Sequence, residues 1–364
     1  MRRTGVANLP LHTGKAPPWL FKRMVKLAGA ISEAVVYEYG KDEFLRRVAN
    51  PYWFQGFGCV IGFDWHSSGL TTTTCGALKI ALDKKDVGVK VAGGKGATSR
   101  KAPDEIAKIG TRFSLSTAKI DRLKYSSAMS AKVDNTLVQD QYQLYQHCFF
   151  LDEKARWAVI QQGMNDTNNY ARRYHWLSDS VKNFVQEPHE AICGDEKKKQ
   201  VLDMTAKKSR EAQKVSLDIV RDRDFRYFTA AKQKTLSEYM GLQKFTMKPG
   251  HYITDMKKIN LETLRRAHEY QPKSYEEMVA LKGMGPKTVR ALALISDLVY
   301  GKQASWKDPV RYSFAHGGKD GVPYPVNKRV YDKSVSILKN AIRQAKLGEK
   351  DRLHAIRRLE GWIE

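Results

Sequence analysis

Residues 274–288 read SYEEMVALKGMGPKT, and this stretch decides the fold of the region around it. Ser274 with Glu277 three residues later forms a capping box, which marks the start of a helix. Gly283 and Gly285 allow a tight turn, because glycine adopts positive φ angles at no steric cost. Pro286 then opens a second helix, since proline is favoured at the first helical position. The stretch therefore predicts two helices joined by a short turn.

The turn also has the features of a phosphate-binding element. We expect the second helix to run to about residue 299, and the backbone N–H groups at its start have no partner inside the helix. Such groups can donate to a phosphate oxygen, and three cationic side chains surround them here. We therefore predict nucleic-acid contacts from Lys282, Gly283, Gly285, Lys287, Thr288 and Arg290. The alternative is an ordinary helical hairpin with a glycine turn.

The glycines and the flanking apolar residues resemble the helix-hairpin-helix family of DNA-binding motifs, which act without sequence specificity. From about Asn260 to Asp308 the chain is also similar to endonuclease-III-like DNA glycosylases, in which Leu-Pro-Gly-Val-Gly-x-Lys follows the first helix. That resemblance implies that Lys287 is an amine nucleophile and that Asp308 is the catalytic aspartate. The sequence departs from the family because Lys282 replaces the usual proline, Pro309 follows Asp308, and there is no cysteine cluster. These departures favour the alternative role of Lys287, a phosphate contact.

The overall charge indicates a polyanionic partner. The 364 residues include 63 Lys and Arg against 39 Asp and Glu, a formal net charge of +24. An excess of this size attracts polyanions at long range, and backbone phosphates supply most of the non-specific affinity for nucleic acids. Together with the hairpin, the charge favours duplex DNA over RNA as the partner. The sequence leaves the oligomeric state open.

Membrane and disulfide-rich classes are not expected. No run approaches the eighteen or so apolar residues of a membrane span, and the first residues lack the apolar run of a secretory signal. The cysteines lie far apart and include no Cys-x-x-Cys, which argues against a zinc ribbon, an iron–sulfur cluster or a disulfide scaffold. We predict a cytoplasmic protein with four small core cysteines: Cys59, Cys75, Cys148 and Cys193.

Apolar periodicity predicts an α+β fold that is mainly helical, with an N-terminal α/β unit followed by a helical region. The expected elements are a helix at 17–39, a strand at 57–63, a helix at 73–84, a strand at 87–91 and hairpin strands at 147–151 and 156–164.

A charge run at Lys197–Lys199 marks a shift in composition near residue 195. We therefore predict a mixed α/β domain at 1–194 and a helical DNA-binding domain at 195–364. The helix-hairpin-helix would occupy residues 274–300 of the second domain.

Asp64 and His66 follow the predicted strand at 57–63, at the end where α/β proteins place their ligands. The two side chains would face one side if the strand continued. They could then hold a divalent metal such as Mg²⁺ or Mn²⁺, or act as a base and its orienting partner. A turn cap and a structural hydrogen bond are the alternative.

Two further polar clusters are candidates. His316 and Lys319 lie in a glycine-rich loop that would let a nucleic-acid backbone approach closely, although an exposed turn explains it as well. Arg172 and Arg173 precede Tyr174-His175-Trp176, a combination of cations that hold phosphates and rings that stack on bases. Burial of those aromatic residues in the core is the alternative that the pattern favours.

Over most of its length the chain resembles an archaeal and bacterial family of unknown function. The resemblance lies in Thr4-Gly5, residues 9–12, residues 62–69, residues 174–176 and residues 313–321. It implies one conserved unit and supplies no activity.

Three functions remain open. The first is a repair-type DNA-processing enzyme, either a glycosylase with lyase activity through Lys287 and Asp308 or a metal-dependent nuclease through Asp64, His66 and His316. The second is a DNA-binding factor without catalysis. The third is an RNA-binding protein.

Overall fold

The computed structural model describes residues 16–63, 67–194, 197–225, 259–310, 328–345 and 347–363. These residues form an α+β fold that is mainly helical and contains a small antiparallel sheet. None of the helices described is long and apolar enough to cross a membrane.

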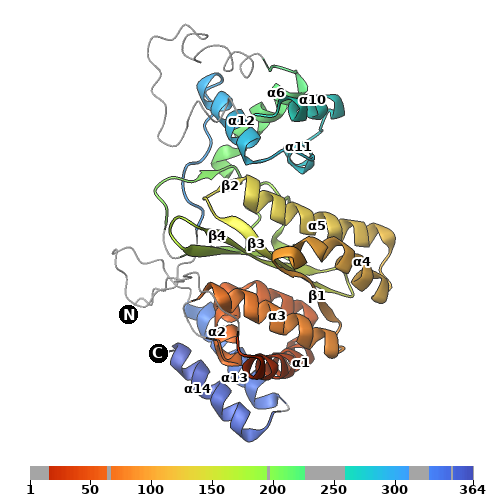
Figure 1. Ribbon diagram of the computed structural model, residues 1–364, viewed down its shortest axis with the longest axis vertical. Coiled ribbons are helices and arrows are strands. Elements are labelled where there is room, and N and C mark those ends of the chain that lie inside the picture. Colours follow the sequence, from red (N-terminus) through yellow and green to blue (C-terminus); the bar gives the residue numbers. More distant parts are fainter. Residues whose placement is uncertain are drawn as a thin grey trace.

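The sheet lies in the middle of the molecule, with helices on both sides (Figure 1). Its five strands have the order β1-β3-β4-β5-β6, and every neighbouring pair is antiparallel. The strands are β1 (Val89–Lys95), β3 (Gln143–Asp152), β4 (Trp157–Asn165), β5 (Tyr170–Leu177) and β6 (Ala191–Cys193).

One face of the sheet packs against helices from both ends of the chain (Figure 1). They are α1 (Pro18–Ala49), α2 (Pro51–Ile61), α3 (Ser68–Lys84), α13 (Lys328–Gln344) and α14 (Glu349–Ile363). Phe150 of β3 and Ile160 of β4 join this core. The last two helices therefore return to the N-terminal ones, whereas the predicted domain boundary near residue 195 stays a prediction.

The opposite face carries the second core, to which Phe149 and Val159 of the same two strands contribute. Helices α4 (Ala102–Arg112) and α5 (Thr117–Thr136) cover it, with the short pair β2 (Val138–Gln139) and β7 (Leu202–Asp203) beside them. Farther from the sheet lie α6 (Arg210–Arg221), α10 (Leu261–Tyr270), α11 (Tyr275–Ala280) and α12 (Pro286–Leu298) (Figure 1).

The predicted strand at 57–63 is wrong, because most of it belongs to α2. Asn50 and Pro51 end α1 but also start α2: the Asn50 side chain accepts from the backbone N–H groups of Tyr52 and Trp53, each at 3.0 Å. Every residue of α2 is buried, so the helix has no polar face that periodicity could reveal. The N-terminal α/β unit built on that strand is therefore replaced by three helices that precede an antiparallel sheet.

The helices and strands predicted in the rest of the N-terminal half are confirmed, with shifted ends. The helix predicted at 17–39 is the first part of α1, the helix at 73–84 lies within α3, and the strand predicted at 87–91 begins at Val89 as β1; β3 and β4 form the predicted hairpin. All four cysteines are free thiols in the interior.

Candidate nucleic-acid interface

The helix α11 begins at the predicted capping box. The Ser274 hydroxyl accepts from the backbone N–H of Glu277 at 3.1 Å. In return, the Glu277 carboxylate accepts from the backbone N–H of Lys273 at 2.7 Å, one residue before the position expected for a capping box. These two bonds fix the orientation of α11. Met284, in the turn that follows, is fully buried.

The turn between α11 and α12 contains two glycines, and the first of them, Gly283, is required. Gly283 has a φ of +91°, and a Cβ atom there would lie 2.7 Å from the Thr263 hydroxyl of α10. Gly285 is different: its backbone is extended and leaves room for a side chain. The glycine at 283 is therefore set both by its backbone conformation and by the approach of α10.

The start of α12 has no side chain that caps it. Gly285 stands at the N-cap and Pro286, the first helical residue, has no N–H group. The backbone N–H groups of Lys287 and Thr288 are consequently the donors of this first turn that the helix itself does not use. Lys282, Gly283 and Lys287 are exposed beside them. The structure thus brings the exposed hairpin residues predicted from the sequence together at one surface turn.

Thr288 and Arg290 lie behind this surface. Thr288 is buried, and Arg290 is half-buried with its Nε donating to the Gln139 side chain at 2.7 Å. The Gln139 amide nitrogen donates in turn to the Pro286 carbonyl at 2.8 Å. On the other side of the turn, the Lys132 ammonium donates to the Leu281 carbonyl at 3.1 Å, and burial lowers the pKa of Lys132. The turn is therefore attached to α5 and β2 at both ends.

Asp308, the predicted catalytic aspartate, faces the interior. Its carboxylate forms a two-pronged ion pair with the Arg172 guanidinium, with distances of 2.9 and 2.5 Å. It also accepts from the backbone N–H groups of Lys198 at 2.7 Å and Val310 at 3.1 Å. A catalytic role would require this carboxylate to leave four hydrogen bonds.

Arg172 and Arg173, both predicted to contact nucleic acid, are fully buried in β5. Arg172 is held by Asp308 and by Asp140 at 3.1 Å. Arg173 points to the other face of the sheet, where its guanidinium donates to Gln55 at 3.1 Å and stacks on the Phe54 ring at 4.9 Å. The structure accounts for both side chains through interior contacts.

Four predicted site residues lie outside the described residues, so the structure does not place them: Asp64, His66, His316 and Lys319. Across the ranges that are described, no group of three or more His, Cys, Asp or Glu side chains could hold a metal ion.

Sequence reasoning missed a buried polar chain between α5 and the sheet. Asp134 accepts from Gln161 at 2.6 Å and pairs with His189 at 2.5 Å, and burial raises the pKa of Asp134. Gln161 then contacts His147 at 2.7 Å, and His147 contacts Ser127 at 2.8 Å. Because the Gln161 oxygen must accept, His147 donates from Nδ1. Burial lowers the pKa of His147 to about 4, so its ring is neutral near pH 7 and its Nε2 accepts from the Ser127 hydroxyl. These hydrogen bonds join residues that are distant in the sequence, so no local pattern could have revealed them.

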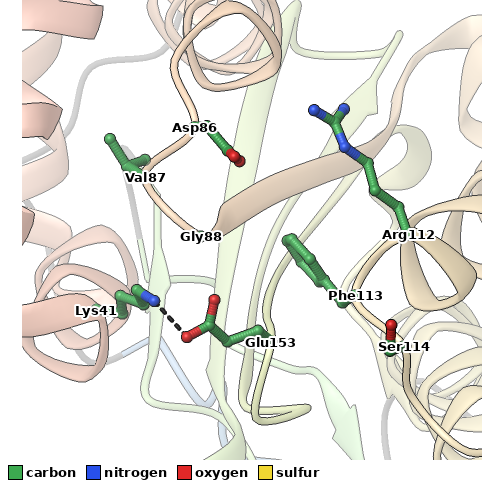
Figure 2. A pocket seen from close by; sticks show the side chains of 8 residues that line it. All are labelled: Lys41, Asp86, Val87, Gly88, Arg112, Phe113, Ser114 and Glu153. Atoms are coloured by element: carbon green, nitrogen blue, oxygen red, sulfur yellow. Dashed lines mark hydrogen bonds and ion pairs between the residues drawn. The ribbon is translucent and has the colours of Figure 1, made fainter.

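A polar cavity of about 600 Å³ opens elsewhere, between the start of β1 and the α4–α5 turn (Figure 2). Its lining combines acidic and basic side chains, and Lys41 forms an ion pair with Glu153 across it. Mixed charges do not favour a polyanion, so this cavity is a weaker candidate for nucleic acid than the α11–α12 turn. The lining residues are Lys41, Asp86, Val87, Gly88, Arg112, Phe113, Ser114 and Glu153.

Comparison with known proteins gives a family and no activity. No curated protein and no solved structure matches the chain. The family described as "Protein of unknown function (DUF763)" matches residues 5–326, which is most of the sequence. The chain therefore belongs to the DUF763 family.

Proposed function

We propose that this protein binds the sugar–phosphate backbone of duplex DNA with the turn between α11 and α12, used as a helix-hairpin-helix. The observation that carries the proposal is the uncapped start of α12, where the N–H groups of Lys287 and Thr288 stand beside the exposed Lys282 and Lys287 side chains. A phosphate oxygen satisfies such donors and interacts favourably with the helix dipole.

The attachment of the turn supports the same proposal. Lys132 and Gln139 hold the carbonyl groups of Leu281 and Pro286, so the donors of α12 keep their direction before a ligand arrives. A preorganised site loses less conformational entropy when it binds. The proposed contacts to DNA join backbone N–H groups of the turn to phosphates and involve no base, which suits binding without sequence specificity.

The experiment is a salt titration of binding to a labelled duplex of random sequence. For each protein, log Kobs is plotted against log salt concentration, which gives a negative slope. Each lost phosphate contact lowers the magnitude of this slope by about one. We expect Lys287→Ala to show this loss on every duplex tested. The matched control is Lys154→Ala, which removes an exposed lysine from the β3–β4 turn and should leave the slope unchanged.

Two outcomes would overturn the proposal: wild-type protein that shows no salt-dependent binding, and a Lys287→Ala variant that behaves like Lys154→Ala. The same samples test catalysis with abasic and uracil-containing DNA, with Mg²⁺ and with chelator. Chelator-resistant cleavage that Lys287→Ala loses while it still binds would add a lyase reaction. Metal-dependent cleavage would instead direct attention to Asp64, His66 and His316.

A further inference from the structure

A single short segment links the start of α12 to the basic run at Lys197–Lys199. Gln139 contacts α12 twice, through the Pro286 carbonyl at 2.8 Å and through Arg290 at 2.7 Å. The next residue, Asp140, accepts from the Lys198 ammonium at 2.9 Å through its backbone carbonyl. Adjacent Cα atoms are about 3.8 Å apart, so the two attachments are one residue step from each other along the chain.

A second connection joins the same two parts. The guanidinium of Arg290 lies 5.8 Å from the ring centre of Trp306. The Trp306 carbonyl accepts from the backbone N–H of Val201 at 3.2 Å, and Asp308 accepts from that of Lys198 at 2.7 Å. The segment around residues 305–308 therefore packs against α12 on one side and against the basic run on the other.

These contacts form a closed frame with a buried anchor. Asp140 and Asp308 both turn inward onto Arg172, which is fully buried. Their negative charge is thus paired inside the protein. Lys199 and Lys307 are exposed on the same segments of chain.

We infer that Lys199 and Lys307 form a second phosphate-binding segment, which contacts the same DNA duplex as the α11–α12 turn. The inference rests on the proposed function and extends it from one contact to two. Duplex DNA is the partner that fits, because it is stiff over about 150 base pairs and meets a rigid frame without bending. Once the turn is bound, the second segment acts at a high effective concentration, so affinity rises without any new conformational change.

The test is a salt titration with the double variant Lys199→Gln/Lys307→Gln. Two lost phosphate contacts should lower the magnitude of the slope of log Kobs against log salt by about 1.8. Combination with Lys287→Ala should lower it by about 2.7, because the two sites act on separate phosphates. The control is Lys154→Gln/Lys182→Gln, which removes two exposed lysines outside the frame and should leave the slope unchanged.

The outcomes separate the two proposals. If the Lys199/Lys307 variant matches the control while Lys287→Ala still lowers the slope, the second segment is refuted and the hairpin stands. If neither lowers the slope, both fail. Equal or tighter binding of an RNA duplex, with the same loss in the double variant, would overturn DNA as the partner. Substitution of exposed lysines leaves the core intact, and an unchanged circular dichroism spectrum checks that each variant folds.

Discussion

Replacement of Asp308 by asparagine separates a structural from a catalytic role for this residue. The two side chains have the same shape, so Asp308→Asn opens no cavity. In the wild-type protein, the Asp308 carboxylate accepts from Arg172, Lys198 and Val310. An asparagine NH₂ group must face one of these donors, and the ion pair with Arg172 loses its charge.

The expected loss follows from the geometry of the pair. Removing one partner of a buried ion pair costs about 3–5 kcal/mol. Asp140 still lies 3.1 Å from Arg172 and keeps part of the compensation, which favours the lower value, about 3 kcal/mol. At about 2 °C per kcal/mol for a long chain, the melting temperature should fall by about 6 °C.

Thermal denaturation followed by circular dichroism measures this change. The control is Asp121→Asn, whose carboxylate is 62% exposed and pairs with Lys124 within α5; exposed pairs contribute less than about 1 kcal/mol. A melting temperature within about 1 °C of wild type would refute the reasoning. If such a stable variant had also lost DNA cleavage, the carboxylate would be catalytic rather than structural.

Three further predictions concern the turn and the core. Gly283→Ala should destabilise the protein by about 1–3 kcal/mol and weaken DNA binding, whereas Gly285→Ala should change stability much less; equal urea midpoints would contradict this. Ser274→Ala should cost about 1 kcal/mol through the lost cap, and an unchanged melting temperature would argue against it. Burial lowers the pKa of His147 from 6.5 to about 4. The unfolded chain therefore binds a proton first as the pH falls, and stability drops by up to about 1.4 kcal/mol per unit between pH 6.5 and 4. His147→Asn should lack this component, so parallel pH profiles of urea unfolding for the two proteins would contradict the assignment.

The sequence predicts the local features of the α11–α12 turn well. Ser274 and Glu277 mark the helix start, Gly283 marks the turn and Pro286 marks the second helix, because each acts through its own backbone or through neighbours within a few residues. The same holds for the β3–β4 hairpin, in which a short polar turn lies between two runs that are mostly apolar.

Features set by distant contacts could not be predicted in this way. Arg172 and Asp308 are 136 positions apart, and Gln139 and Arg290 are 151 positions apart. Nothing in the residues near Asp308 shows that its carboxylate will form an ion pair with a guanidinium from β5. The error in α2 has a related cause, because a helix that tertiary packing buries on every side has the same apolar pattern as a buried strand.

The two arginines of β5 show why net charge alone does not locate an interface. Consecutive side chains of β5 point to opposite faces of the sheet, and both faces are covered by a core. Arg172 therefore reaches Asp308 on one side, and Arg173 reaches Gln55 on the other. Both count toward the formal charge of +24, yet neither lies at the surface. Cations that meet a phosphate must be exposed and held near other donors. In the described part of the chain, the exposed Lys282 and Lys287 of the α11–α12 turn meet that condition, and the salt titrations test whether Lys199 and Lys307 add to it.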